Sequence, residues 1–243
     1  MDVCGNCNVD RRSFLATSAA TITGITAIGI AGFGSAAHAA SLTQADRDAM
    51  TPDDVISLLL AGNDRFAAGN LQPRDFLAEQ RTSAGGQHPA AVALTCIDSR
   101  APLEVICDLG IGDAFNARVA GNAVNDDILG SIEFACAAAG AKLVMVMGHT
   151  ACGAVKGAID DVELGNLTGL LAKIRPAISE TTYSGKRTAS NPEFVDAVAR
   201  THVAMAVKEI RERSQVLRDL ETHGKIKIVG SMYDLETAKV TLI

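Results

Sequence analysis

Four short apolar runs, separated by helical patterns, constrain the fold of this chain more than any other feature. They cover residues 90–97, 114–119, 142–147 and 225–230. The first is an unbroken run of the kind that lies buried on both faces of a parallel sheet, and the other three are similar. Alternating strands and helices predict an α/β fold with a central, mainly parallel sheet flanked by helices. Residues 240–243 are expected to add an edge strand.

Helix signals lie between and before these runs. Thr51 is a good N-cap, and Pro52 suits the first position of the helix that follows. A second short helix is expected around Asp75–Thr82, and together these segments predict an N-terminal helical arm. Further helices are expected over residues 126–139, 166–180 and 191–223.

Length and composition favour a single catalytic domain that acts on a small molecule. The 243 residues, 48% of them hydrophobic, are enough to bury one substantial core. A net charge of −6, without any run of Lys and Arg interleaved with aromatics, argues against nucleic acid as a partner. The absence of Trp, with only two Tyr, argues against a stacking platform for single strands or sugars.

The first 39 residues have the order of an export signal. Arg11 and Arg12 form a basic start, and residues 19–33 are apolar but shorter than the roughly 20 residues of a spanning helix. The triplet Ala37-His38-Ala39 suits signal peptidase. We therefore expect residues 1–39 to be cleaved and residues 40–243 to form the catalytic domain. A membrane anchor is the alternative interpretation.

The paired arginines resemble the bacterial twin-arginine signal. They are followed by Phe14 and Leu15, as in that signal, although Asp10 stands where Ser or Thr is usual. This resemblance predicts export of the folded protein by the Tat translocation machinery and a periplasmic or secreted location. Two of the six cysteines, Cys4 and Cys7, would leave with the signal.

Two polar motifs follow the first and third predicted strands. Cys96-Ile97-Asp98-Ser99-Arg100 follows the first, and Gly148-His149-Thr150-Ala151-Cys152-Gly153 follows the third. In a parallel sheet, ligands gather just beyond the carboxyl ends of the strands. Neighbouring strands would therefore bring these distant motifs together.

The residue types in the two motifs suit zinc. Cys96, His149 and Cys152 offer two thiolates and an imidazole, and three protein ligands leave a fourth position for water or substrate. Two thiolates donate negative charge to the metal and so weaken its effect on the pKa of that water, which means that another group in the site must compensate. Asp98 could orient the bound water, or ligate the metal itself in a closed state, and Arg100 is placed to hold its carboxylate.

Other interpretations of these residues remain open. A closed structural zinc site, a zinc-binding protein without enzymatic activity, and a thiol nucleophile paired with His149 all use the same side chains. Cys107 and Cys136 lie on apolar segments and are interpreted as core residues. The remaining histidines are expected to be core or solvated residues; they are His88, His202 and His223, with His38 in the predicted signal.

Cys-x-Asp-Ser-Arg followed by His-x-x-Cys-Gly resembles the signature of the β-carbonic anhydrases. The resemblance extends over residues 51–243. It includes Arg118, Asn122, the run Ser131-Ile132-Glu133-Phe134, and Gly230-x-x-Tyr233-Asp234.

This resemblance implies one Zn²⁺ per subunit, held by Cys96, His149 and Cys152, with Asp98 and Arg100 as the catalytic pair. It implies the zinc-dependent reversible hydration of carbon dioxide to bicarbonate and a proton by a zinc-bound hydroxide. Related folds with the same ligands hydrolyse carbon disulfide or carbonyl sulfide, which is the alternative activity.

The plant-like subgroup of this family has further matching positions. Gln87 matches a substrate-binding glutamine, Phe115 and Phe134 match aromatic pocket residues, and Gly153 offers its backbone N–H. The family places its active sites at a dimer interface, so we expect a homodimer or higher oligomer in which Gln87 and Phe134 serve the neighbouring subunit's zinc. Another subgroup has a non-catalytic bicarbonate pocket that relies on a Trp, which this chain lacks.

Overall fold

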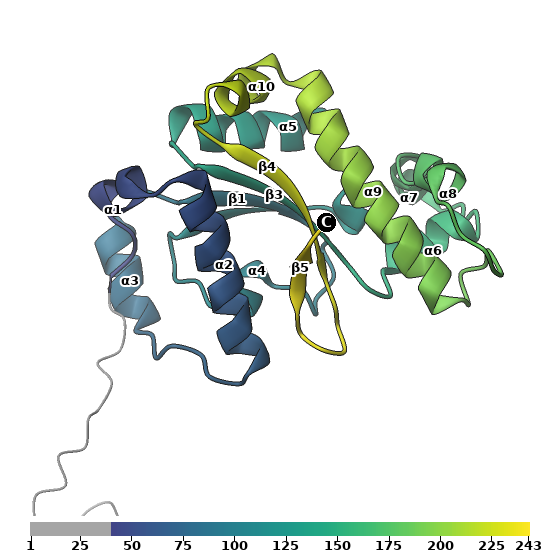
Figure 1. Cartoon of the computed structure of the whole chain (residues 1–243), viewed down its shortest axis with the longest axis horizontal. Helices are drawn as coiled ribbons and strands as arrows, with labels where there is room; N and C mark the ends of the chain where they lie inside the picture. The colour runs from purple at the N-terminus through teal and green to yellow at the C-terminus, as the bar shows by residue number, and fades with distance from the viewer. Residues whose placement is uncertain (1–39) are drawn as a thin grey trace, which may run out of the picture. The chain divides into compact units, whose positions relative to one another are not determined.

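A five-stranded sheet lies between two layers of helices (Figure 1). The computed structural model describes residues 40–243, so the predicted signal, with Cys4 and Cys7, lies outside the described residues. The strands are β1 (Ala91–Thr95), β2 (Ala114–Arg118), β3 (Leu143–His149), β4 (Lys227–Tyr233) and β5 (Val240–Leu242). Their order in space is β2-β1-β3-β4-β5, with the first four parallel and β5 antiparallel to β4. This arrangement confirms the predicted α/β fold.

The helices fall into three groups around the sheet (Figure 1). The N-terminal arm and one face contain α1 (Gln44–Ala49), α2 (Pro52–Ala67), α3 (Phe76–Ser83) and α4 (Leu103–Ile106). The opposite face is covered by α5 (Asp126–Glu133), α9 (Pro192–Arg213) and α10 (Gln215–Thr222). Beyond the carboxyl ends of the strands lie the 3-10 turn Ala120–Asn122 and the helices α6 (Gly153–Ile159), α7 (Gly165–Ala172) and α8 (Arg175–Glu180).

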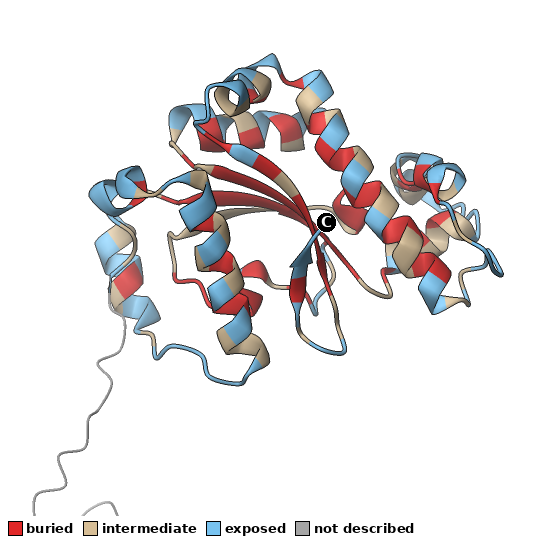
Figure 2. Ribbon diagram, in the orientation of Figure 1, coloured by how far each residue is buried: buried red, intermediate tan, exposed pale blue. Residues whose placement is uncertain are grey.

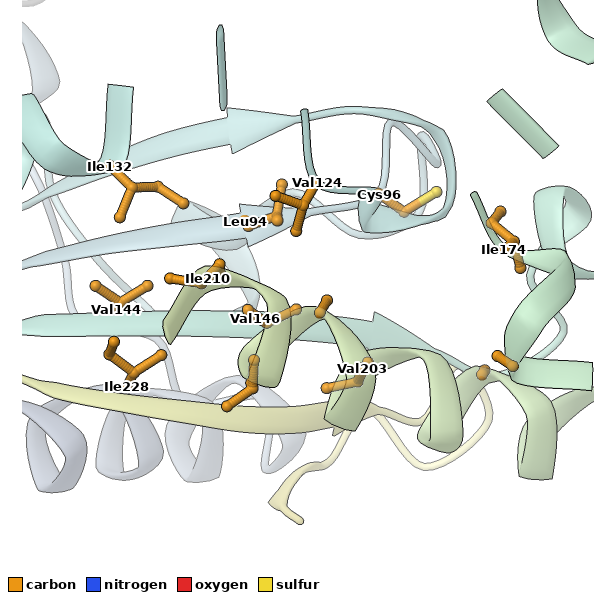
Figure 3. Close-up of a cluster of buried hydrophobic side chains, with 14 of the residues drawn as sticks. Leu94, Cys96, Val124, Ile132, Val144, Val146, Ile174, Val203, Ile210 and Ile228 are labelled. Atoms are coloured by element: carbon orange, nitrogen blue, oxygen red, sulfur yellow. The ribbon is translucent and has the colours of Figure 1, made fainter. Parts of the chain in front are cut away.

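Both faces of the sheet are packed, as the apolar runs predicted. Every residue of β1 and β3 is buried, and these two strands form the red centre of Figure 2. On one face, the strand residues Leu94, Val146 and Ile228 form a buried apolar cluster with residues of α9 (Figure 3). Val203 and Ile210 are the α9 residues labelled there. Full burial of one such side chain stabilises the fold by about 1.5–3 kcal/mol, so this packing holds the sheet against the helices.

The arm begins as its capping residues predict. The hydroxyl of Thr51 accepts the N–H of Asp54 at 3.2 Å, and the Asp54 carboxylate accepts the N–H of Thr51 at 2.8 Å. This reciprocal capping box satisfies two backbone donors that a helix start leaves without partners. Val55 and Leu59 then face the sheet and are buried. α2 is thereby docked on the face opposite α9.

Two of the predicted helices are wrong in their continuity, and a third changes type along its length. The segment 166–180 is divided into α7 and α8, because Pro176 lacks an N–H and its ring cannot continue a helix from Ala172. The segment 191–223 is divided at Ser214, whose extended backbone and hydroxyl cap the start of α10 by accepting the N–H of Leu217. The segment 126–139 changes from α-helix to a π-helix over Phe134–Ala138.

Two strand boundaries also differ from the prediction. β4 begins and ends later than the apolar run 225–230. β3 extends past the predicted 142–147 to His149, because Gly148 and His149 still pair with Met232 and Tyr233 of β4. His149 is therefore held by the sheet itself. The short helices α1, α4 and α6 carry no apolar period long enough to have been predicted.

The strand order creates a topological switch point at the carboxyl end of the sheet. The chain passes from β1 to β2 on one side and later returns to place β3 on the other side of β1. The segments after β1 and β3 therefore leave in different directions, which is where open α/β sheets bind their ligands. Within residues 40–243, none of the helices combines the length and apolar character needed to cross a membrane.

Candidate metal centre and active site

Three metal-ligating side chains converge at this switch point. Cys96 follows β1 directly, His149 is the last residue of β3, and Cys152 is the N-cap residue of α6. One ligand atom from each lies within 4.8 Å of the other two, and all three residues are buried. Neighbouring parallel strands thus bring together motifs that are distant in sequence.

The donors of this cluster fit a zinc ion. The Nδ1 atom of His149 lies 2.9 Å from the carbonyl oxygen of Thr150, so its proton is directed there. Nε2 of His149 is then the free lone pair, and it is buried without a hydrogen-bond partner among residues 40–243. A buried, unpartnered nitrogen beside two cysteine sulfurs is the donor set of a Cys₂His zinc site, which leaves one position open.

The backbone around the ligands is shaped by two left-handed residues. Gly121, with φ +65°, donates its N–H to the sulfur of Cys96 at 3.2 Å. A side chain at Gly121 would lie 2.5 Å from Cδ1 of Ile174, so only glycine fits this close approach. Ala151 adopts φ +55° between His149 and Cys152 and turns the chain so that both residues face the same point.

A hydrogen bond between the side chains of Cys96 and Cys152 makes the pKa values of the two thiols unequal. Their hydrogen bond lowers the pKa of Cys96, and the N–H of Gly121 adds to that effect against the opposing influence of burial. The same hydrogen bond, together with burial, raises the pKa of Cys152. The first thiolate therefore forms on Cys96, and a metal cation is needed to remove the second proton. The Gly121 N–H also withdraws charge from the sulfur, which partly compensates for a ligand set with two thiolates.

Asp98 and Arg100 form an ion pair beside the ligands. Nε of Arg100 donates to one carboxylate oxygen of Asp98 at 2.9 Å, and Nη2 donates to the other at 2.7 Å. These hydrogen bonds hold the pKa of Asp98 well below its usual range, although burial opposes the shift. One oxygen of Asp98 lies 3.8 Å from Nε2 of His149, but Asp98 is not among the ligand cluster.

Arg118 has a role that the sequence did not reveal. It is the last residue of β2 and stands beside Thr95 in the sheet register. Its Nε donates to the carbonyl of Cys96 at 3.0 Å, and its Nη2 donates to the carbonyl of Asp98 at 2.6 Å. Arg118 thus holds the turn that carries a metal ligand and the carboxylate. The signal was its place at the carboxyl end of a strand next to β1.

Three of the predicted substrate-binding residues do not lie beside these ligands in the single chain. Phe115 and Phe134 pack edge to face, with ring centroids 6.1 Å apart, in a groove of about 710 Å³ along the outer strand β2. Gln87 is exposed and lines a separate polar hollow with Gln80 and Gly112. Gly153, in contrast, follows Cys152 directly as the first residue of α6.

Within residues 40–243, the other cysteines and histidines lie in the core or at the surface, as predicted. Cys107 and Cys136 are buried, and burial raises the pKa of each thiol to about 12, so both remain protonated. His202 is buried in α9 and burial lowers its pKa, whereas His223 is exposed and His88 is half-buried. Among the described residues, the metal-ligating cluster consists of Cys96, His149 and Cys152 alone.

Comparison with known sequences supports this assignment of the site. A sequence model of the family described as carbonic anhydrase matches residues 91–240. Carbonic anhydrase 2 of Mycobacterium tuberculosis (strain H37Rv) is 34% identical over 186 residues, which cover 76% of this chain and 89% of that protein. The carbonic anhydrase of Mycolicibacterium smegmatis is 32% identical over 183 residues, or 74% and 88% of the two chains.

Comparison with solved structures agrees. The β-carbonic anhydrase CafA of Aspergillus fumigatus superposes with a TM-score of 0.62 at 30% identity and covers 78% of this chain and 91% of its own. A Coccomyxa β-carbonic anhydrase, at 20% identity and a TM-score of 0.58, shares the fold over 79% of this chain and 82% of its own. The family match, the relatives and the shared fold lead to one conclusion: the chain belongs to the β-carbonic anhydrases.

Proposed function

We propose that this chain catalyses the reversible hydration of carbon dioxide to bicarbonate and a proton, with one Zn²⁺ per subunit. The observation that carries the proposal is the convergence of Cys96, His149 and Cys152 beside a carboxylate that an arginine holds. When bound, zinc acts as a Lewis acid that lowers the pKa of a water ligand and so supplies a hydroxide nucleophile near neutral pH.

The chain's own residues orient the reaction. Asp98 is ionised, because its pKa is lowered by Arg100, and an ionised carboxylate only accepts hydrogen bonds. It therefore accepts a hydrogen bond from the nucleophile and directs a lone pair of that nucleophile toward the substrate carbon. The side chain of Arg100 is 55% exposed, so this end of the site is open to solvent, where bicarbonate and the proton leave.

The alternatives to this activity are less well supported. A protein that only stores zinc has no need for an oriented acceptor, yet Asp98 is fixed by three hydrogen bonds from Arg100. A hydrolase for carbon disulfide or carbonyl sulfide uses the same ligands, but the relatives reported above are carbonic anhydrases. Turnover of carbon dioxide against the two sulfur compounds distinguishes these activities directly.

Replacement of one ligand tests the proposal. Cys96→Ser is expected to lose bound zinc and at least 100-fold in hydration rate, because a serine hydroxyl is a poor zinc ligand. Cys136→Ala is the matched control, since Cys136 is also buried but lies in the π-helix away from the ligands. Full activity in Cys96→Ser would overturn the assignment.

We propose further that the protein is a homodimer or larger assembly through the open edge of the sheet. β2 is the outer strand there, and Phe134 beside it is 56% exposed. Gln87 and Phe134 then serve the partner's site, which accounts for their distance from the ligands of their own chain. Light scattering is expected to give at least a dimer for the wild type. A monomer for Phe134→Asp supports this edge, and an unchanged assembly contradicts it.

The plant-like subgroup is the finer assignment that we propose. Its support is the Asp98–Arg100 pair, which leaves the fourth metal position to water, and the lack of any Trp in the sequence. X-ray absorption of the zinc-loaded protein at neutral pH is expected to show two sulfurs, one nitrogen and one water oxygen. The rate of bicarbonate dehydration is also expected to saturate with bicarbonate and not to fall at high concentration. Inhibition by bicarbonate would contradict the assignment.

We propose that residues 1–39 direct export through the twin-arginine pathway to the periplasm or beyond. The support is the sequence alone: Arg11 and Arg12, the apolar segment after them, and the Ala37-His38-Ala39 triplet. Replacement of both arginines by lysine is expected to retain the precursor in the cytoplasm. N-terminal sequencing of the exported form is expected to begin near Ala40, and export of the lysine variant would contradict this route.

A further inference from the structure

Helix α9 places a carboxylate against the loop that carries two of the metal ligands. Asp196 lies in the second turn of α9 and is half-buried. One of its carboxylate oxygens accepts the backbone N–H of Ala151 at 2.9 Å, across 45 positions of sequence. Ala151 stands between His149 and Cys152, so this hydrogen bond acts on the segment that sets the spacing of the two ligands.

Ala151 needs such support because of its backbone conformation. Its φ of +55° is in the left-handed region, which costs an alanine about 1–2 kcal/mol. The preceding residue is held by the sheet, since the N–H of Thr150 donates to the carbonyl of Tyr233 at 3.0 Å. At Ala151 the chain turns away from β4, and its N–H points to α9 instead. A charged acceptor at that point stabilises the turn.

A missing side chain lets α9 come close enough to make this bond. A Cβ atom at Gly148 would lie 2.7 Å from Cγ2 of Val203 and 2.9 Å from the sulfur of Met232. Gly148 therefore allows α9 to pack directly on the end of β3. The carboxylate of Asp196 then reaches the loop two residues beyond His149.

We propose that Asp196 is a positioning residue of the metal centre: it fixes the Ala151 peptide and thereby the separation of the His149 and Cys152 ligand atoms. This inference rests on the proposed zinc site. Partners that orient metal ligands contribute typically 10–100-fold to metal affinity or activity, although they never touch the metal. Asp196 acts one step further out, through the backbone between two ligands.

The test measures zinc retention in Asp196→Ala, Asp196→Asn and the control Glu212→Ala. Each full-length, zinc-loaded protein is mixed with an excess of a chromophoric chelator, and the zinc release rate is followed by absorbance. Asp196→Ala is expected to release zinc about 10-fold faster than the wild type. Asp196→Asn keeps an acceptor oxygen but loses its charge, and is expected to release zinc at a rate between those of the wild type and Asp196→Ala. Glu212, on the same helix, pairs with Lys208 at the surface and is expected to have no effect.

A second measurement separates positioning from general stability. Zinc raises the melting temperature of a protein that binds it only when folded. A positioning role makes this zinc-induced rise smaller in Asp196→Ala, whereas a merely structural role lowers the melting temperature with and without zinc alike. Wild-type release rates and an unchanged zinc-induced rise in Asp196→Ala would overturn the inference. Loss of zinc from the wild type itself would instead contradict the proposed function.

Discussion

Arg100 holds both carboxylate oxygens of Asp98, with its Nε and Nη2 atoms 2.9 and 2.7 Å from them. The two residues are separated by one position, and the backbone N–H of Arg100 makes a third hydrogen bond to Asp98. The carboxylate is thereby kept ionised and turned in one direction. An oxygen of Asp98 nevertheless lies only 3.8 Å from the ligand nitrogen of His149.

Arg100→Ala is expected to lower kcat/KM for carbon dioxide hydration by about 100-fold, the size of effect typical of a positioned proton-transfer group. Without the arginine, Asp98 is free to move toward the metal and to occupy the position of water. Zinc content is expected to stay at one per subunit, because the three ligands are untouched. Arg81→Ala removes an exposed arginine from α3 and serves as the control. An active Arg100→Ala enzyme would show that the pair is not needed.

Gly121→Ala is expected to destabilise the fold by about 2–4 kcal/mol, because the left-handed conformation and the contact with Ile174 both oppose a side chain. The same change is expected to weaken zinc binding, since the N–H that reaches Cys96 moves with the backbone. Chemical denaturation and zinc titration measure the two effects.

Gly169→Ala is the matched control for that substitution. Gly169 lies inside α7, and a Cβ atom there meets nothing within 4 Å. Alanine at that site is expected to stabilise the protein by about 0.5–1 kcal/mol. Equal effects of the two glycine substitutions would contradict the account of the Gly121 turn.

Glu221 is expected to make part of the stability depend on pH. Its pKa is lowered from the ordinary value of 4.5, first by hydrogen bonds from Arg211 at 2.8 Å. Because the pKa of Glu221 is lowered by folding, its ionised form stabilises the protein fully above the unfolded pKa of 4.5. This stabilisation is lost as the pH falls through the pKa of Glu221 in the folded protein. Because the arginine side chain is 41% exposed, the contribution is about 1 kcal/mol.

The comparison of Glu221→Gln with wild type measures this contribution by urea denaturation across pH 7 to 3. The difference in the free energy of unfolding is expected to be largest at pH 7 and to shrink as the pH falls below 4.5. Glu212→Gln, at an exposed pair 3.6 Å long, is the control. A difference that grows as the pH falls would contradict a lowered pKa for Glu221 in the folded protein.

The sequence was sufficient for the features that depend on local pattern. The apolar runs predicted the strands, and their carboxyl ends predicted where the two motifs would meet, since β1 and β3 are neighbours in the sheet. The motif residues therefore predicted the cluster of Cys96, His149 and Cys152 that the structure brings together. Cys107 and Cys136, on apolar segments, were correctly separated from those ligands.

Other features depend on contacts that no local pattern contains. Arg118 and Asp196 act on backbone groups of distant residues. The strand-end position of Arg118 was visible in the sequence, but the carbonyl and N–H groups that the two side chains contact were not. The break between α9 and α10 was missed because Ser214 is compatible with a helix and is made a cap only by its tertiary surroundings.

Stopped-flow hydration of carbon dioxide tests the central claim most directly. The zinc-loaded protein is measured against the buffer rate across mildly acidic to alkaline pH, then after removal of zinc by a chelator, and again after zinc is restored. The account predicts hydration well above the buffer rate, its loss with the metal, and its return with added zinc. A fully zinc-loaded protein without hydration at any pH would contradict it.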